Sequence, residues 1–146
     1  MTKNLEQKIF DRFKFYRPEL SNKVSLMCFG FECGDGWFQL LWNLSEKIDA
    51  ILIKYIPEQE LAKRLLTDDM PINISQVKEK FGTLRFYVNF GDISEKVYYE
   101  IEEAINDAEE ISAVTCELCG EEGKQQSGGW IRTLCDKCEE ERNSGK

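Results

Sequence analysis

Four cysteines near the C-terminus have the spacing of a metal site. Cys116 and Cys119 form one C-x2-C pair, Cys135 and Cys138 form a second, and 15 residues separate the pairs. Two intervening residues allow one tight turn to present both sulfurs of a pair to a single ion. Four thiolates fill the tetrahedral shell of zinc and leave no position for a reactive water. We therefore expect one structural Zn²⁺ per chain.

The other two cysteines, Cys28 and Cys33, are expected to be buried free thiols outside the metal shell. The chain has no histidine, and two cysteines alone do not make a second zinc site. We find no secretory signal peptide, because the N-terminal residues mix charges into every turn, and no membrane-spanning stretch. The chain is therefore expected in the cytoplasm, where thiols stay reduced.

Cationic and aromatic residues gather in a second segment, SQVKEKFGTLRFYVNF at 75–90. It predicts a β-hairpin closed by a type II′ turn at Gly82-Thr83, with Lys80 opposite Arg85 and Lys78 opposite Tyr87. Strand alternation then separates an apolar face from a polar one. The apolar face is Val77, Phe81, Leu84, Phe86, Val88 and Phe90, and the polar face is Gln76, Lys78, Lys80, Arg85, Tyr87 and Asn89.

The like-charge pair of Lys80 and Arg85 across the hairpin is unfavourable by itself. Either carboxylates within the protein compensate it, such as those of the acidic helix expected at 94–111, or the side chains spread into solvent. Alternatively, Lys78, Lys80 and Arg85 hold an anionic ligand while Tyr87 stacks on a ring. Both explanations remain open at this point.

Asp35 and Trp37 precede a strongly apolar helix expected at 36–55. Asp35 is a natural N-cap for that helix, and Trp37 is of a type that is usually mostly buried. The same two residues are candidates for a ligand-facing carboxylate and a stacking ring. We carry both as candidate ligand-binding residues.

The residue types give no catalytic centre. Without histidine the chain lacks the commonest general base, and it contains no GxSxG, P-loop or GxGxxG motif. Its carboxylates lie mostly on a predicted helix face, although the hairpin register places Glu79 on the apolar face. We predict no catalytic residues and no enzymatic activity.

Charge is divided unevenly along the chain. Residues 1–90 hold 13 basic and 12 acidic residues, whereas residues 91–146 hold 6 basic and 15 acidic ones. Because binding to nucleic acid requires a basic surface for the phosphates, we expect no general nucleic-acid binding.

The elements that must position these residues predict an α+β fold. Apolar periodicity predicts helices over 3–16, 36–55, 58–66 and 94–112, covering the apolar face of a small antiparallel sheet with the hairpin at its centre. We divide the chain into an α+β domain, 1–112, and a zinc-ribbon-like module, 113–146, packed on it as one unit.

Three motifs in combination resemble those of a family of small tailed-phage and prophage proteins. They are GFECGDGW at 30–37, VKEKFGTLRFY at 77–87, and TCELCG…GGW…TLCDKC at 115–138. The resemblance carries over no active residues, but the motifs direct attention to Asp35, Trp37, Phe81, Leu84, Arg85, Phe86 and Tyr87. It implies a small accessory protein that binds a host component or a host signalling nucleotide in the host cytoplasm.

The sequence therefore favours a non-enzymatic binding protein with one structural zinc. Its expected partner is an anionic small molecule, such as a nucleotide-type host immune signal, or a host protein. The alternative is a zinc-ribbon adaptor that regulates a host nucleic-acid-processing machine, with its acidic half contacting a protein rather than DNA.

Overall fold

A computed structural model describes residues 1–145 and has the predicted α+β architecture. A β-hairpin lies at the centre of the larger part, and a second, shorter hairpin belongs to the cysteine-bearing C-terminal module. The elements are α1 (Lys3–Arg12), α2 (Phe38–Tyr55), α3 (Glu58–Leu66), β1 (Ile72–Lys80), β2 (Thr83–Phe90), α4 (Glu95–Ser112), β3 (Lys124–Gln126), β4 (Arg132–Leu134) and α5 (Asp136–Ser144).

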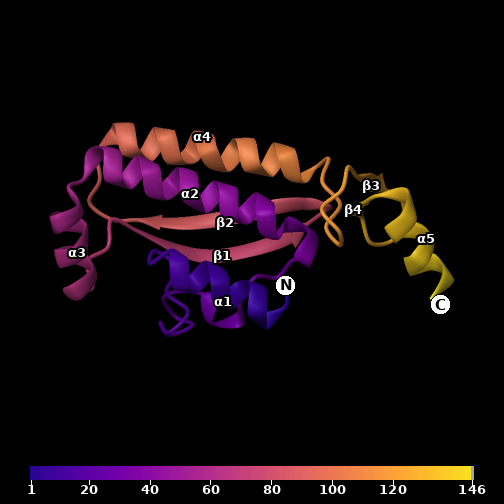
Figure 1. Cartoon of the computed structure of the whole chain (residues 1–146), viewed down its shortest axis with the longest axis horizontal. Helices are drawn as coiled ribbons and strands as arrows, with labels where there is room; N and C mark the ends of the chain where they lie inside the picture. Colours follow the sequence, from indigo (N-terminus) through magenta and orange to yellow (C-terminus); the bar gives the residue numbers. More distant parts are fainter. Residues whose placement is uncertain (146) are drawn as a thin grey trace.

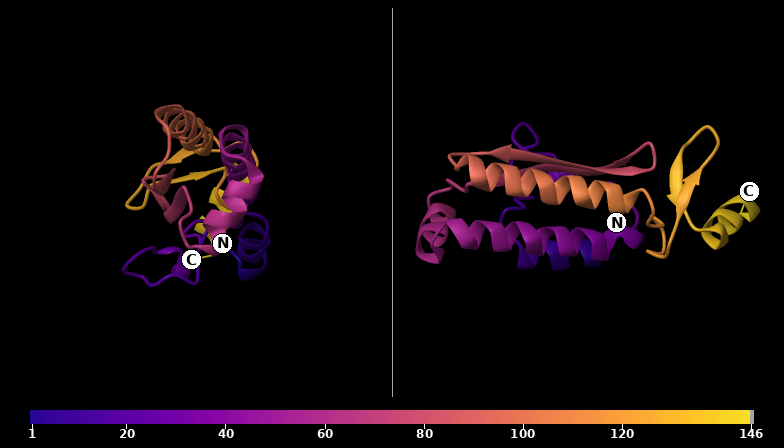
Figure 2. Two further views of the ribbon diagram at one scale, coloured as in Figure 1. Left: turned by 90° about the vertical axis from the view of Figure 1, so that its left-hand side faces the viewer. Right: turned by 90° about the horizontal axis from the view of Figure 1, so that it is seen from above.

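Helices α2 and α4 run side by side over one face of the β1–β2 hairpin, and α1 lies beside them (Figures 1 and 2). Helix α3 is at one end of the long axis. The C-terminal module, β3 to α5, is at the other end, next to the tip of the hairpin (Figure 1). The hairpin thus runs along the helical layer and meets the module at its tip (Figure 1).

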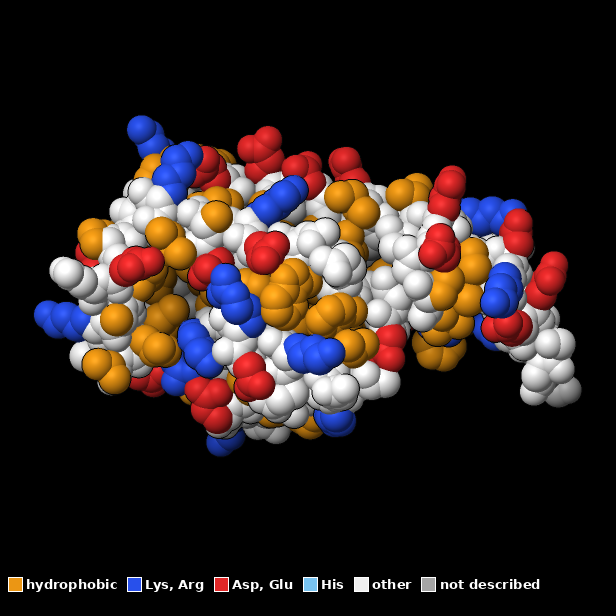
Figure 3. Space-filling model, viewed as in Figure 1, with side chains coloured by type: hydrophobic (Ala, Val, Ile, Leu, Met, Phe, Trp, Pro, Cys, Tyr) orange, Lys and Arg blue, Asp and Glu red, His pale blue; other side chains and the backbone are white. Residues whose placement is uncertain are grey.

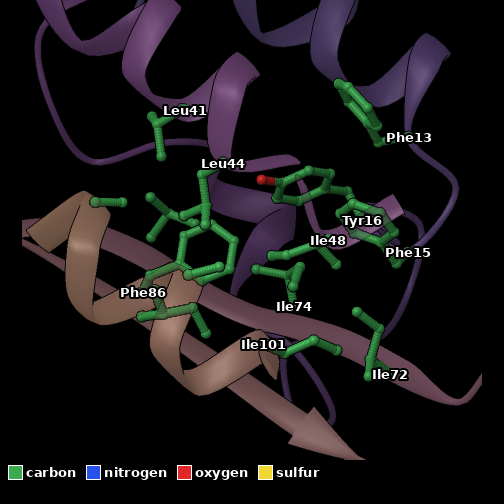
Figure 4. Packing of buried hydrophobic residues seen from close by; sticks show 14 of the residues in the cluster. Phe13, Phe15, Tyr16, Leu41, Leu44, Ile48, Ile72, Ile74, Phe86 and Ile101 are labelled. Atoms are coloured by element: carbon green, nitrogen blue, oxygen red, sulfur yellow. The ribbon is translucent and has the colours of Figure 1, made fainter. Parts of the chain in front are cut away.

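The core fills the space between the hairpin and the helices. Leu41, Leu44 and Ile48 from α2 meet Ile101 from α4 and Phe86 from β2 (Figure 4). Near its centre, the hydroxyls of Tyr16 and Ser45 lie 2.8 Å apart, and Ser45 Oγ also donates to the Leu41 carbonyl at 2.7 Å. Burial raises the pKa of Tyr16 well above its ordinary value, so this hydroxyl stays protonated as a hydrogen-bonding group.

The hairpin closes one residue earlier than predicted. Its turn residues are Phe81 and Gly82, both with positive φ (53° and 81°), as a type I′ turn requires. The turn is held by the Glu79 carboxylate, which accepts a hydrogen bond from Gly82 N–H at 2.8 Å. The predicted turn at Gly82-Thr83 was therefore wrong, and Phe81 lies exposed at the tip instead of on the apolar face.

The corrected register changes the cross-strand pairs but keeps the polar residues on one face. Lys78 lies opposite Arg85, Gln76 opposite Tyr87, and Lys80 opposite Thr83. A bulge at Ser75 then shifts the pairing, so that Ile74 lies opposite Val88. The predicted like-charge pair is thus present with Lys78 in place of Lys80.

Both outer edges of the hairpin have hydrogen-bond partners. On the β1 edge, Ile74 N–H donates to the Phe15 carbonyl and Glu79 N–H to the Glu32 carbonyl. On the β2 edge, α4 supplies side chains: Leu84 N–H donates to Ser112 Oγ at 2.8 Å, and Phe86 N–H donates to a Glu109 carboxylate oxygen at 3.4 Å. The two strands are therefore embedded among the other elements.

Other predicted boundaries shift slightly. Helix α1 ends at Arg12, before the aromatic residues that enter the core, and α2 begins at Phe38 after a short 3-10 turn, Asp35–Trp37. Ser94 is the N-cap of α4, where its hydroxyl accepts a hydrogen bond from Val97 N–H. Within residues 1–145, no helix combines the length and the apolar character needed to cross a membrane.

Candidate metal centre and binding face

The four paired cysteines meet in the C-terminal module. Cys116 and Cys119 lie in the turn that follows α4, Cys135 is the N-cap of α5, and Cys138 lies in its first turn. The four sulfur atoms are within 4.8 Å of one another, so they can hold one metal ion. Cys28 and Cys33 lie outside this group, and the described residues contain no other such cluster. Cys33 is buried as predicted, whereas Cys28 is exposed, so the prediction was wrong for Cys28.

The sulfur geometry fits a small tetrahedral ion. Sγ of Cys119 and Sγ of Cys135 are 3.7 Å apart. A tetrahedron with metal–thiolate bonds of about 2.3 Å has sulfur separations of about 3.8 Å. Although burial opposes ionisation, backbone N–H groups near Cys116 lower the pKa of its thiol to about 7. Burial and the neighbouring sulfur atoms both raise the pKa of the Cys138 thiol, which disfavours its thiolate form. A bound cation would stabilise the thiolate.

Glu117, between the first two cysteines, joins the module to the larger part. Its buried carboxylate accepts hydrogen bonds from Gly34 N–H at 2.9 Å and from the Arg132 guanidinium at 3.0 Å. Its carbonyl accepts another from Gly36 N–H. The Gly34-Asp35-Gly36 turn therefore packs directly on the turn that carries Cys116 and Cys119, the first cysteine knuckle. A Cβ atom added to Gly36 would collide with backbone atoms of this knuckle.

This joint explains the positions of Asp35 and Trp37. Trp37 is completely buried, and its indole Nε1 donates to the Thr115 carbonyl at 2.9 Å, so the ring cannot stack on a ligand. Asp35 does not cap α2. Its carboxylate accepts a hydrogen bond from Thr2 N–H at the start of α1. The structure thus separates both residues from the hairpin face and overturns the ligand-stacking role for Trp37.

Lys78, Lys80, Arg85 and Tyr87 do share one face of the hairpin. Helix α4 packs on the opposite face and against the β2 edge, where its Glu109 interacts electrostatically with Arg85 but its carboxylates do not pair with Lys78 or Lys80. Across residues 1–145, none of the three cations has a carboxylate within salt-bridge distance. Arg85 instead donates to Thr83 Oγ1 and the Leu84 carbonyl, while Tyr87 is 43% exposed.

A hollow of about 380 Å³ lies where the hairpin tip approaches the β3–β4 loop. The hairpin lines it with Lys78, Lys80, Phe81 and the Glu79 carboxylate, which is hydrogen-bonded to Gly82 N–H. The loop lines it with Gly128, Gly129, Trp130 and Ile131. Both rings are unusually open to solvent, Phe81 at 64% and Trp130 at 70%. The sequence motifs drew attention to Phe81, but the predicted register assigned it to the apolar face. Trp130 was not predicted as a site residue, although the Gly-Gly-Trp run between the cysteine pairs was a visible signal.

The chain matches no protein-family model, no curated protein and no solved structure in these comparisons.

Proposed function

We propose that this protein is a non-enzymatic binding protein, stabilised by one structural zinc, that holds a nucleotide-type anion on its cationic hairpin face. The ligand base would enter the hollow at the hairpin tip, and its phosphates would lie along Lys78, Lys80 and Arg85. In a phage-like setting, which the motif resemblance suggests, the ligand class would be a host signalling nucleotide.

The observation that carries this proposal is the meeting of two exposed aromatic rings with unpaired lysines in one hollow. Two exposed rings in one hollow leave apolar surface that a ligand can cover, and the faces of aromatic rings bind nucleobases by stacking. Lysine and arginine side chains without carboxylate partners are available for phosphate oxygens. The two features together match the two halves of a nucleotide.

The metal centre supports the binding site from a distance. Thr133 on β4 donates from Oγ1 to the Gly82 carbonyl at 2.6 Å, and Gln125 on β3 donates from Nε2 to the Phe81 carbonyl at 3.2 Å. Both bonds hold the hairpin tip against the module that carries Trp130. Because four thiolates fill the coordination shell, the zinc would be structural. Its role would be to hold the module in place as one wall of the hollow.

The metal assignment is tested by native mass spectrometry of protein purified without chelator. One zinc per chain is expected, and Cys135→Ser should lose it, whereas Cys28→Ser should retain it. Protein without zinc, or equal metal content in the two variants, would exclude the assignment.

The ligand assignment is tested by thermal melting with ATP, GTP and cyclic dinucleotides, using inorganic phosphate for comparison. A ligand that binds the folded state stabilises it by about 2.7 kcal/mol at a hundredfold excess over Kd, and this raises the melting temperature. Trp130→Ala should abolish the shift. Tyr99→Ala, which removes a similarly exposed ring on α4, should preserve it. Equal shifts in both variants would contradict a site at the hollow.

A paired control separates binding from folding. Arg85→Ala should lose ligand binding and change stability by less than about 0.5 kcal/mol, because its side chain is on the outer face. Phe86→Ala, which opens the core, should cost about 3–5 kcal/mol. If Arg85→Ala is as destabilising as Phe86→Ala, Arg85 is a structural residue and the proposed face is not the binding site.

A further inference from the structure

A groove follows the seam between α2 and α4 and ends at the first cysteine knuckle. Its volume is about 870 Å³, within the upper range of protein binding clefts. Leu40 and Leu44 of α2 and Ala104, Ala108 and Ile111 of α4 give it an apolar lining. The groove does not include the hairpin tip or Trp130, so it is separate from the hollow described above.

The groove exists because α4 carries small side chains where it faces α2. Ala104 and Ala108 are one helical turn apart, followed by Ile111 on the same stripe. The alanines are too short to fill the seam, and Ile111 remains 48% exposed beside it. An apolar strip of this kind, running along two helices, has the shape that receives a third helix.

The charge around the groove is strongly acidic. Glu103, Asp107 and Glu110 repeat at i, i+4 and i+7 on α4, next to the alanine stripe, and all three are exposed without an ion-pair partner in residues 1–145. Figure 3 shows acidic side chains along this edge of the molecule. The groove lining adds Asp35, Glu46 and Glu121 against a single cation, Lys47.

We propose that this groove binds a basic amphipathic helix of a partner protein. The partner's apolar stripe would cover Leu40 and Ile111, above the buried Leu44 and Ala108, while its lysines or arginines would face the acidic rim. An anionic ligand is disfavoured there, and so is a second copy of this chain, whose net charge is −8. The inference does not depend on the nucleotide proposal, because it uses different residues and the opposite charge.

A helical peptide of about 18 residues, with leucines at helical spacing and lysines elsewhere, serves as the probe. It should bind the metal-loaded protein in a calorimetric titration and shift the methyl NMR signals of Leu44, Ala108 and Ile111. A peptide of the same composition in shuffled order should bind at least about tenfold more weakly, because it has charge but no apolar stripe. Equal affinity for the two peptides would overturn the proposal.

Charge reversals provide the matched controls. Glu103→Lys with Asp107→Lys should weaken peptide binding by at least about tenfold. Glu58→Lys with Glu60→Lys changes the net charge equally on α3, at the far end of the molecule, and should weaken binding by less than about threefold. Equal weakening by both double variants, or NMR shifts confined to residues outside the groove, would show that the peptide binds through general attraction to an acidic protein.

Discussion

At the scale of single residues, Glu117 lies in the first cysteine knuckle and also connects the C-terminal module to the larger part of the protein. It lies between two candidate ligands, yet its carboxylate points away from them, toward Gly34 and Arg132. The side chain is only 6% exposed, so the charge is compensated by these partners and not by water. Removing one member of such a buried ion pair strongly destabilises the folded state, because the other charge is left without a partner.

Glu117→Ala should therefore reduce the free energy of unfolding by about 3–5 kcal/mol, since it leaves Arg132 and Gly34 N–H without their acceptor. Urea unfolding measures the change. Glu19→Ala is the control, because Glu19 makes an exposed ion pair with Arg17 and should cost no more than about 1 kcal/mol. Similar losses in the two variants would mean that the joint does not depend on Glu117.

The Glu109 carboxyl should make the free energy of unfolding depend on pH. Burial raises the pKa of this carboxyl above its ordinary value of 4.5, while the Phe86 N–H and Arg85 act in the opposite direction. Because the folded state holds the proton more tightly than the unfolded state, stability is lost as the pH rises from about 4.5 through the folded-state pKa.

Glu109→Gln keeps an acceptor for Phe86 N–H but removes the ionisation. The variant should therefore gain stability relative to wild type as the pH rises from 4 to 7. Urea midpoints of both proteins at these two values measure the difference. A relative gain on acidification would show that the carboxylate is stabilising in its charged form.

At the scale of elements, the turn of the β1–β2 hairpin places an exposed aromatic ring at a position where that residue type is unfavourable. Phe81 adopts φ of 53°, a left-handed conformation that costs non-glycine residues roughly 1 kcal/mol or more. Asparagine suits this turn position far better. Phe81→Asn should thus stabilise the protein by about 0.5–1 kcal/mol and weaken binding of any ligand that stacks in the hollow.

Thermal melting and nucleotide titration of the same Phe81→Asn preparation test this pair of effects. Phe29→Ala, which removes an exposed ring outside the hollow, is the control for loss of aromatic surface alone. Stabilisation without any loss of binding would remove Phe81 from the site.

The same hairpin illustrates what sequence can and cannot predict. Alternation correctly placed Lys78, Lys80, Arg85 and Tyr87 on one face, because that pattern is local. The turn was misplaced by one residue because its position depends on the Glu79 carboxylate and on Thr133, which is 51 positions away from Gly82. Trp37 was equally ambiguous until its hydrogen bond to Thr115 was known.

At the scale of the whole molecule, the buried residues form two clusters of unequal size. The larger contains 23 residues from α1, α2, α4, the hairpin and their connections, and none of the four clustered cysteines. The smaller consists of Cys116, Leu134 and Cys138. A cluster of three residues is too small to maintain a fold, so we expect the module to depend on a metal bound by its four cysteines.

Removing the metal with a chelator should therefore unfold residues 115–138 and leave the larger cluster folded. Hydrogen exchange should show loss of protection in the module, together with faster exchange at the hairpin tip, which the module holds through Thr133. Protection of α2 and α4 should persist. Simultaneous loss of protection throughout the chain would show that the two clusters unfold as one.

The metal cluster was predictable from sequence because each C-x2-C pair is local and the two pairs together define the site. The hollow and the α2–α4 groove were not, since each combines residues from distant elements. The hollow joins the hairpin tip to the β3–β4 loop, and the groove joins two helices separated by the hairpin in the chain.

The occupied edges of the β1–β2 hairpin have a consequence for behaviour at high concentration. Unpaired strand edges recruit strands from other molecules, which is a common route to aggregation. Here the Phe15 and Glu32 carbonyls occupy donors on one edge, while Ser112 and Glu109 occupy those on the other. A sheet of only two strands is thereby protected from adding foreign strands at these positions, without the third and fourth strands that larger sheets use.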